Sequence, residues 1–589
     1  MSKKIEPNEL EIKRHSLAHI MASVIEEMFP DAKFAIGPTI EDGFYYDFDL
    51  PRTLIPEDLP LIEEKMLALI KKNIPFEKIE VKIDDAIETA KKVGQNYKAE
   101  LLEQIKSEGE KSVSFYKTDK FVDLCRGPHI ASTGKINPRS FKLISIAGAY
   151  WRGDEKNKML QRIYGVAFQN KEELKGYIAQ QAEAEKRDHR KIGKELGLFM
   201  FSEEIGKGLP LWLPKGAFIR KKLEDYMYET EKANGYDFVY TPVLANENLY
   251  KKSGHLSHYK DDMYAPIEIE NEKYYLKPMN CPHHHIMYAS TNRSYNDLPI
   301  RYADFSPIHR HERSGALTGL IRTRSFSQND AHIYCSKQDV EKEISKVLDM
   351  FKKVYNDFHI KNYWFRLSLP NFNDKEKYGD ITNKALWEKS ANYARKALEK
   401  SGEKFDEISG EAAFYGPKID VQIKNVMGKK DTIATAQVDF YMPTKFDLNF
   451  INEKGEKERP FIIHRAIMGS FDRFFAFLVE QTSGHFPIWL SPIQVQIIPV
   501  SDKHEDYAKK ITNELTESNI LVEATKGNET LGKRIRAGQL QKIPYLIIVG
   551  DKEINAKSIA VRHREKGDMG SITIDEFIKL VQDEIKQKK

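Results

Sequence analysis

The sequence predicts a multidomain protein of mixed α+β and α/β class. The chain has 589 residues, enough for roughly three to five domains of about 100–200 residues each. Residues 1–168 and 196–490 mix helical and strand patterns, whereas residues 491–589 alternate between strands and helices. Regular alternation is typical of a compact α/β domain. We therefore predict domains at 1–168, 196–490 and 491–589, with a linker at 169–195.

The linker is predicted to be a charged, mostly solvated helix. It is rich in Glu, Lys, Gln and Ala, and its apolar positions are sparse, at Leu174, Tyr177 and Ile178. This composition is typical of a helical spacer between domains. In the central block that follows, strand-like segments occur at 237–240, 274–276, 418–423 and 436–440.

The C-terminal domain is predicted from its alternating pattern, after a boundary marked by Pro487 and Pro492. Apolar and β-branched residues cluster in short runs that favour strands, with charged segments between them that favour helices. The predicted strands are 495–500, 520–525, 545–550 and 558–564, and the predicted helices begin at His504, Glu529 and Ile574.

The bulk properties exclude several classes of protein. Cys125, Cys281 and Cys335 are too few and too scattered for a disulfide framework, and they suit a reducing compartment. The N-terminus lacks the apolar core of a signal peptide, and the longest apolar runs, such as 474–479, are far too short to span a membrane. We expect a cytoplasmic protein. Because the net charge is only +4, a nucleic-acid partner would have to be held by local basic patches.

Residues 310–332 form the densest group of chemically useful side chains. They hold four arginines, two acids, a phenylalanine ring, two amides and two histidines. A salt-bridged surface hairpin would explain any one of them, but so much charge is hard to bury without a ligand. Arginine grips phosphate oxygens bidentately. Phe326 offers a face to a base and Asp330 an anion to an amine, so ATP plus an amino acid would satisfy the set.

This segment resembles motif 2 of the class II aminoacyl-tRNA synthetases. Motif 3 is matched by Gly469-Ser-Phe-Asp-Arg473-Phe-Phe, and the motif 1 proline at the dimer interface by Pro242. With LKPMNCP (276–282), FYGPKID (414–420) and RPFIIHRAIMGS (459–470), the chain resembles the threonyl branch of this class from about His15 to its C-terminus. The resemblance implies an N-terminal editing domain, a catalytic domain built on an antiparallel sheet, a C-terminal anticodon-binding domain and a homodimer.

The resemblance also implies the reaction. Threonine would attack the α-phosphate of ATP, which binds with Mg²⁺, giving threonyl-adenylate and pyrophosphate before transfer to tRNA(Thr). Such catalysis depends on positioning and charge neutralisation. The implied catalytic residues are Arg310, at the α-phosphate, Lys418, near the carboxylate, and Arg473, at the β and γ end. The implied ATP-binding residues are Arg310, Glu312, Arg322, Phe326, Gln437 and Arg473, and the implied threonine-binding residues are Gln328, Asp330 and Tyr415.

Two departures from the family pattern bear on this site. The family usually has Trp-Gln before a small-Thr-x-Gln stretch, whereas residues 431–437 here read DTIATAQ and keep only the final Gln437. Family members often have glycine after NCP, where this chain has His283, His284 and His285. We interpret these histidines as surface or helix-start residues, with the preceding cysteine as the metal ligand.

Cys281, His332 and His464 match the family's zinc ligands, which implies one Zn²⁺ per subunit. Their spacing alone does not predict a shared site, and Cys335 is the rival thiol. Three protein ligands leave a fourth position open, as in functional zinc sites. Threonine could then bind through its amino group and hydroxyl, whereas valine has no hydroxyl to coordinate.

Zinc cannot reject serine, because one missing methyl is worth only about 1–3 kcal/mol, roughly 10–200-fold. A hydrolytic site for seryl-tRNA(Thr) is therefore expected, and HSLAH, DLCRGPH and GAYWRGD match the family's editing domain. We favour a metal-free deacylase, with a second zinc as the alternative. The implied editing residues are His15, His19, Lys98, Tyr116, Asp123, Cys125 and His129.

The resemblance assigns anticodon reading to the C-terminal domain. Unpaired bases present edges that amides, acids and arginines can read, and the segment 532–542 is locally basic, although a solvated helix face would look the same. Thr530 stands where the family usually has lysine, and the usual ubiquitin-like domain looks absent because only fourteen residues precede His15. The candidate base-reading residues are Asn528, Arg536, Glu553 and Arg562.

Two rival functions remain open from the sequence. One is a synthetase-like RNA-binding regulator, and the other is a stand-alone deacylase with an inactive synthetase body. Neither would need Arg310, Arg322, Arg473 and three metal ligands. ATP–pyrophosphate exchange with threonine distinguishes both from a ligase.

Overall fold

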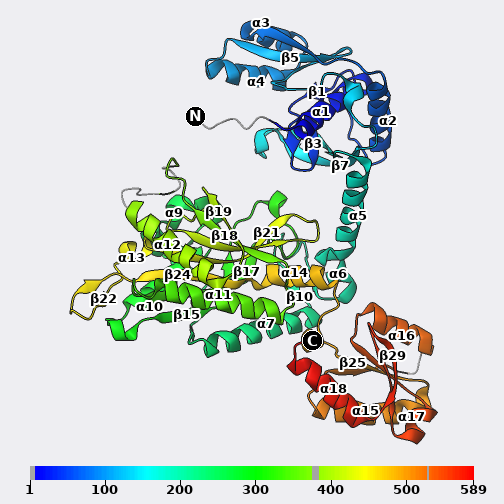
Figure 1. Ribbon diagram of the computed structural model, residues 1–589, viewed down its shortest axis with the longest axis vertical. Helices are drawn as coiled ribbons and strands as arrows, with labels where there is room; N and C mark the ends of the chain where they lie inside the picture. Colours follow the sequence, from blue (N-terminus) through cyan, green and yellow to red (C-terminus); the bar gives the residue numbers. More distant parts are fainter. Residues whose placement is uncertain (1–6, 375–377, 379–383, 527–528) are drawn as a thin grey trace. The chain divides into compact units, whose positions relative to one another are not determined.

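The computed structural model describes residues 7–374, 378, 384–526 and 529–589 (Figure 1). It divides into two compact units, Met1–Ala182 and Glu183–Lys589. Each unit has its own hydrophobic core, so we describe them separately.

The first unit is built around the helix α1, Glu9–Met28, packed on an antiparallel sheet. Asn8 and Glu11 form a capping box that begins α1, satisfying amide groups that have no partner within the helix. Leu17, Ile20 and Val24 of α1 lie in the core. The sheet has the order β1-β3-β8-β7, with β2 paired to β3. Helix α2 (Asp58–Lys71) packs against α1 and β7. The strands are β1 (Lys33–Phe34), β2 (Thr39–Ile40), β3 (Gly43–Asp49), β7 (Phe141–Tyr150) and β8 (Met159–Ala167).

A smaller layer of the same unit contains a three-stranded antiparallel sheet and two helices (Figure 1). The helices contact each other and bury Ala86, Ala90 and Leu102 against the sheet. This layer and the loop that follows it carry five of the predicted editing residues, on α4, β5, β6 and the loop after β6. Its elements are β4 (Glu77–Lys82), α3 (Ile83–Lys92), α4 (Asn96–Ser107), β5 (Ser112–Thr118) and β6 (Phe121–Leu124).

The predicted linker helix is in fact two helices, α5 (Lys171–Arg187) and α6 (His189–Leu196). Asp188 begins the second, accepting a hydrogen bond from the Arg190 amide. The prediction of a mostly solvated helix is wrong for one face of α6, because His189, Ile192, Gly193 and Leu196 are buried. Ile192 and Leu196 join the core of the second unit.

The second unit contains a nine-stranded sheet of order β11-β15-β17-β24-β21-β20-β18-β19, with β16 paired to β17. All pairs are antiparallel except β11–β15 and β18–β19. The predicted antiparallel catalytic sheet is thus confirmed. The strands are β11 (Asp237–Phe238), β15 (Ile300–Asp304), β16 (Pro307–His309), β17 (Ser325–Cys335), β18 (Tyr363–Leu369), β19 (Phe405–Ser409), β20 (Lys418–Lys424), β21 (Lys430–Asp439) and β24 (Phe461–Ser470).

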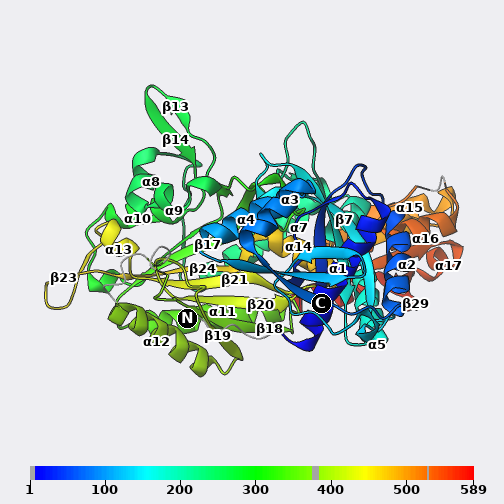
Figure 2. The same ribbon diagram turned by 90° about the horizontal axis from the view of Figure 1, so that it is seen from above.

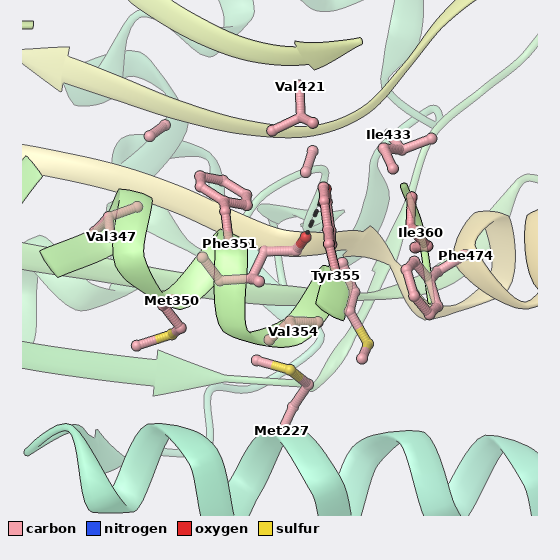
Figure 3. Packing of buried hydrophobic residues seen from close by; sticks show 14 of the residues in the cluster. Met227, Val347, Met350, Phe351, Val354, Tyr355, Ile360, Val421, Ile433 and Phe474 are labelled. Carbon is pink, nitrogen blue, oxygen red and sulfur yellow. Dashed lines mark hydrogen bonds between the residues drawn. The ribbon is translucent and has the colours of Figure 1, made fainter. Parts of the chain in front are cut away.

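One face of this sheet is covered by helices that build the main core. Phe351 and Tyr355 of α11 pack there with Phe474 of α14 and Met227 of α7 (Figure 3). The Tyr355 hydroxyl donates a 3.3 Å hydrogen bond to the Ile467 carbonyl, joining helix to sheet. These helices are α7 (Pro214–Ala233), α11 (Val340–Asp357), α12 (Lys384–Ser401) and α14 (Phe471–Thr482).

The opposite face of the sheet is where polar side chains of β17 gather. Side chains alternate along a strand, so Ala331 and Ile333 enter the main core while Tyr334 packs on the other side, against Tyr288. Tyr288 belongs to α10, Cys281–Ala289. In Figure 2 the strands β17, β24, β21 and β20 lie between α10 and α12.

The C-terminal part forms a five-stranded sheet of order β26-β25-β27-β28-β29. The first three strands are parallel to one another and the last two antiparallel, which confirms a C-terminal α/β domain. Strand β29 and helix α17 were not predicted. The elements are β25 (Val495–Pro499), α15 (Glu505–Glu517), β26 (Val522–Ala524), α16 (Leu531–Leu540), β27 (Tyr545–Val549), α17 (Asp551–Ala556), β28 (Ile559–His563), β29 (Gly567–Ile572) and α18 (Ile574–Lys586). Across the described ranges, no helix has the length and apolar character needed to cross a bilayer.

Candidate active site

A cleft on the open face of the large sheet collects most of the predicted nucleotide-binding residues. It lies where the β16–β17 connection approaches β21 and the start of α14, and Thr432, Ala434 and Gly469 contribute to its floor. The predicted residues that line it together are Arg310, Glu312, Arg322, Phe326, Gln328 and Arg473.

Three guanidinium groups make this cleft suited to an anion. The Arg310 guanidinium carbon lies 5.3 Å from the centre of the Phe326 ring, and Arg322 Nε donates to Glu312 Oε2 at 2.8 Å. Arg473 Nε donates to the Ile321 carbonyl at 3.1 Å. Burial lowers the pKa of Arg473, and Arg310 and Arg322 act in the same direction. An anionic ligand would relieve this repulsion between like charges.

Gln437 does not itself line the cleft, although its Nε2 donates a 3.2 Å hydrogen bond to the hydroxyl of Thr435, which does. In the sheet it pairs with His464 on one side and Lys418 on the other. Its Oε1 accepts a hydrogen bond from the Tyr415 hydroxyl, and the Tyr415 ring lies 5.1 Å from that of His464. Lys418 forms a 3.2 Å ion pair with Asp420. The structure thus groups Gln437 with Tyr415 and His464 and does not bring it together with the other residues predicted to bind ATP.

The structure brings Cys281, His332 and His464 together. All three are buried, and one potential ligand atom from each lies within 4.8 Å of the others. His332 and His464 are direct partners across β17 and β24, which places their side chains on the same face. Cys335, three residues beyond His332, points to the opposite face and enters the main core. Geometry therefore favours Cys281 over the rival thiol.

The surroundings of these residues fit a metal ion. His464 Nε2 lies 2.8 Å from Asp439 Oδ2, and His332 Nδ1 lies 2.8 Å from His284 Nδ1. These contacts leave one ring nitrogen of each ligand histidine for a metal, the usual arrangement in protein metal sites. Burial lowers the pKa of His332 far below its usual value, which keeps the imidazole neutral. One thiolate and two neutral imidazoles suit Zn²⁺.

The thiol of Cys281 carries its proton when no metal is bound. Burial and the carboxylates of Asp330 and Asp439 raise the pKa of Cys281 well above its usual value. Since a metal binds the thiolate, binding at neutral pH must release this proton. The affinity of the site should consequently rise with pH.

The three consecutive histidines form a second layer behind this group. They lie at the start of α10, as predicted, but the surface interpretation is wrong because all three are buried. His284 contacts His332, and His285 Nδ1 lies 2.8 Å from the Tyr334 hydroxyl. His285 also forms a possible metal-binding group with Asp439 and His464. Asp439 was not predicted, although its spacing of two from Gln437 places both residues on one face of β21.

Strand β17 connects the anion-binding cleft to Cys281, His332 and His464, which we call the metal group. Phe326, Gln328, Asp330 and His332 occupy alternate positions, and Gln328 and Phe326 line the cleft. Asp330 lies between them and the histidine, and burial raises its pKa. Successive same-face residues are about 6.6 Å apart along a strand. Strand β17 thus runs from the arginine-lined cleft at one end to Cys281, His332 and His464 at the other.

The predicted editing residues form a cluster in the first unit. Cys125 Sγ lies 3.1 Å from His15 Nε2 and 3.2 Å from His129 Nε2. The rings of His129 and Tyr116 are 4.5 Å apart, and His129 Nδ1 contacts Ser16 Oγ at 3.0 Å. One potential ligand atom from each of His15, Cys125 and His129 lies within 4.8 Å of the others, so the geometry permits either a metal or a metal-free pocket.

The remaining members supply a buried charge pair beside this group. Lys98 Nζ lies 2.7 Å from Asp123 Oδ1 and donates to the Tyr46 hydroxyl at 3.0 Å. His19 is 3% exposed, and its Nε2 has no hydrogen-bond partner among the described residues. Burial lowers the pKa of His19 to about 4 and raises that of Cys125 to about 11. Tyr46, which was not predicted, accepts from Lys98 and donates to Asp123.

The predicted anticodon-binding residues have mixed environments. Arg536 on α16 and Arg562 on β28 are exposed. Glu553 is half-buried and accepts a 2.9 Å hydrogen bond from the Gly550 amide as a cap of α17. Arg534, inside the basic segment, is buried and donates to the Glu529 carbonyl at 3.0 Å, so it stabilises the fold. Asn528 lies outside the described residues.

The antiparallel sheet, the arginine-lined cleft and the C-terminal α/β domain define a class II aminoacyl-tRNA synthetase. Family models agree: residues 264–482 match the tRNA synthetase class II core domain (G, H, P, S and T) and residues 494–584 match the anticodon binding domain. Residues 113–164 match the threonyl and alanyl tRNA synthetase second additional domain.

Comparison with individual proteins narrows this class. The chain is 48% identical over 584 residues to the threonine–tRNA ligase of Geobacillus kaustophilus, covering 99% of this chain and 89% of that one. Identity to the Halalkalibacterium halodurans threonine–tRNA ligase is 47%, with coverage of 98% and 89%. The chain therefore belongs to the threonine–tRNA ligase family.

Solved structures show the same relationship. The RNA binding domain of threonyl-tRNA synthetase from Cryptosporidium parvum superposes with a TM-score of 0.63 and 36% identity, covering 67% of this chain and 98% of that one. The putative threonyl-tRNA synthetase ThrRS-1 from Aeropyrum pernix gives a TM-score of 0.62 and 28% identity, with coverage of 68% and 96%.

Proposed function

We propose that the chain activates threonine with ATP, transfers it to tRNA(Thr) and hydrolyses seryl-tRNA(Thr) in its first unit. The observation that carries the synthetic part is strand β17. Its residues Gln328, Asp330 and His332 lead from a cleft lined by three arginines to a buried group of zinc-type ligands. The first unit carries the editing-type cluster around Cys125.

The arginines would act by neutralising the phosphates. The carboxylate of threonine attacks the α-phosphate and pyrophosphate leaves, so two anions must approach each other. Arg310 would contact the α-phosphate, and Arg322 and Arg473 the β and γ phosphates, with Mg²⁺ accompanying ATP. Phe326 and Glu312 border the same cleft and would receive the adenine. Each charge-assisted hydrogen bond contributes on the order of 1.5–3 kcal/mol.

Cys281, His332 and His464 would hold one zinc ion per subunit. When bound, the ion supplies an open coordination position for the amino group and hydroxyl of threonine. Asp330, on the same face of β17, would accept hydrogen bonds from these two groups. Valine has the same shape but leaves Asp330 without a hydroxyl partner, and such a loss discriminates strongly. Tyr415 and Gln437, beside His464, would border the side-chain methyl.

The first unit would remove serine. We favour hydrolysis without a metal, because the neutral histidines and the Lys98–Asp123 pair can orient water and a ribose hydroxyl next to the ester. Three ligands, His15, Cys125 and His129, would suffice for zinc in the alternative. Counting zinc per subunit separates the two possibilities.

The C-terminal domain would read the anticodon. Arg536 and Arg562 are exposed and can reach base edges or phosphates, while Glu553 would have to leave its capping role to accept from a base. We place the protein in the cytoplasm, since its three cysteines are free thiols.

ATP–pyrophosphate exchange tests the proposed synthetic activity. We expect exchange with threonine, weaker exchange with serine, and only background with valine. Arg473→Ala should lower exchange on the order of 10- to 150-fold for each charge-assisted bond lost. Arg313→Ala is the control, because this exposed arginine does not line the cleft. A wild-type protein that gives no threonine-dependent exchange would be the regulator or the deacylase considered above.

We also expect a homodimer through the surface around Pro242. Tyr240 is 87% exposed and Tyr228 is 40% exposed; with Phe238 and Phe305 they border an open groove beside α7. Exposed aromatic groups of this kind are typical of interfaces. Sedimentation at micromolar concentration should give a dimer, and Tyr240→Asp should shift it toward monomer. A wild-type monomer with full activity would contradict the proposal.

A further inference from the structure

His189, the first residue of α6, joins the helix α14 to the loop between β16 and β17. It is 1% exposed. Its Nε2 lies 3.0 Å from the backbone nitrogen of Leu320, and its Nδ1 lies 2.7 Å from Glu480 Oε1. A backbone N–H can only donate, so Nε2 must accept and Nδ1 must carry the proton given to Glu480. The two contacts thus hold the His189 ring in one orientation from both sides.

The loop that His189 holds carries part of the anion-binding cleft. It runs from residue 310 to 324 and includes Glu312 and Arg322, which line the cleft. Leu320 and Ile321, next to Arg322, are both tied to α14: Leu320 through His189 and Glu480, and Ile321 through Arg473 Nε. Arg473 lines the cleft, so a bound phosphate would draw it away from Ile321. The His189 contact lies outside the cleft lining and would remain.

Gly319 shows how closely the loop approaches His189. Its φ is +48°, a conformation that side chains disfavour, and a Cβ built there would lie 2.2 Å from His189 Nε2. The close approach therefore depends on glycine at this position. Asp188 and Glu480 could together suggest a cation site at His189, but both ring nitrogens are already used by Leu320 and Glu480.

We propose that His189 is a positioning residue for ATP binding: it anchors the loop at Leu320 and so places Arg322 and Glu312 around the nucleotide. This rests on the proposed function of the cleft. Losing the anchor should raise KM for ATP about tenfold, the equivalent of about 1.4 kcal/mol and the size of one hydrogen bond. The KM for threonine and kcat should change by less than about threefold, because the metal group and Arg310 do not depend on the loop tip.

Three substitutions separate the two contacts of His189. A glutamine amide reaches the position of Nε2, so His189→Gln can still accept from Leu320 and should keep KM for ATP near wild type. Asparagine reaches only the position of Nδ1, so His189→Asn keeps the Glu480 contact and should behave like His189→Phe. Gly319→Ala should raise KM for ATP as well, because the added Cβ displaces the loop. His485→Phe is the matched control, since His485 follows α14 and contacts the Thr482 carbonyl.

The measurements are ATP–pyrophosphate exchange kinetics and hydrogen–deuterium exchange of the 317–324 peptide in the full-length protein. We expect faster deuterium uptake in His189→Phe, His189→Asn and Gly319→Ala, but not in His189→Gln or the control. The proposal is overturned if the first three keep KM for ATP within twofold of wild type, or if glutamine fails to rescue. Absence of exchange activity in the wild type would instead reject the proposed function, and deuterium uptake would still report on the anchor.

Discussion

Replacing Cys281 with alanine should remove the central zinc and abolish threonine activation. The thiol is one of three ligands whose atoms lie within 4.8 Å of one another in a buried site. The variant keeps two imidazole ligands but loses the only anionic ligand of the site. The two imidazoles alone do not compensate for the free-energy cost of desolvating a divalent ion. Without the metal, the amino group and hydroxyl of threonine lose one of their two proposed partners and keep only Asp330, and full recognition of a hydroxyl is worth on the order of 10⁴–10⁵ in specificity.

Metal analysis of the purified variant should show less than one zinc per subunit, together with loss of threonine-dependent exchange. Cys335→Ala is the matched control, because Cys335 is also buried but points into the main core from the opposite face of β17. The Cys335→Ala variant should keep its zinc, and only its free energy of unfolding should decrease. Full zinc occupancy and activity in Cys281→Ala would exclude this thiol as a ligand.

The metal group shows what spacing alone could not predict. His332 and His464 are 132 residues apart, and only the pairing of β17 with β24 makes them neighbours. Strand register depends on long-range packing, which a local pattern does not encode. The resemblance to the family predicted that Cys281, His332 and His464 lie together. Alternation along β17 places Cys335 on the opposite face from His332, away from this group.

Other differences have equally local causes. The α6 sequence HRKIGKEL has only two large apolar side chains, Ile192 and Leu196, and such a composition predicts a solvated helix. Its first residue, His189, is nevertheless buried and makes polar contacts with Leu320 and Glu480. The burial of a histidine whose two ring nitrogens are both hydrogen-bonded cannot be predicted from the pattern of apolar residues in the sequence. Gln437 was assigned to the nucleotide from its motif, but strand pairing places it beside His464. Tyr46 could not be predicted from the sequence, because its hydrogen-bond partners, Lys98 and Asp123, are distant from it along the chain.

Replacing both His15 and His19 with alanine should abolish proofreading and spare synthesis. The two histidines lie one turn apart on α1, His15 against Cys125 and His19 against the ring of His129 at 5.0 Å. Burial lowers the pKa values of both imidazoles, so at neutral pH each is neutral and able to accept a proton from water or from a ribose hydroxyl. Alanine removes both acceptors and leaves a cavity beside His129.

The metal group of the second unit contains neither residue, so threonine activation should be unchanged. Serine would still be activated at the modest discrimination that one methyl allows, roughly 10–200-fold. The variant should therefore charge threonine normally and accumulate seryl-tRNA(Thr), whereas the wild type clears it. The measurement is deacylation of preformed seryl-tRNA(Thr) by the full-length proteins. Glu9→Ala/Lys13→Ala is the control, because it removes an i,i+4 ion pair from the same helix without touching the cluster.

The zinc content of this variant then decides between the two editing chemistries. A metal-free site predicts one zinc per subunit in both wild type and double variant, with all of it lost in Cys281→Ala. A zinc-dependent site predicts two in the wild type and one in each variant, since His15 is among the three possible ligands in the first unit. If the double variant instead clears seryl-tRNA(Thr) at the wild-type rate, the cluster around Cys125 does not perform the hydrolysis, and discrimination against serine must occur elsewhere.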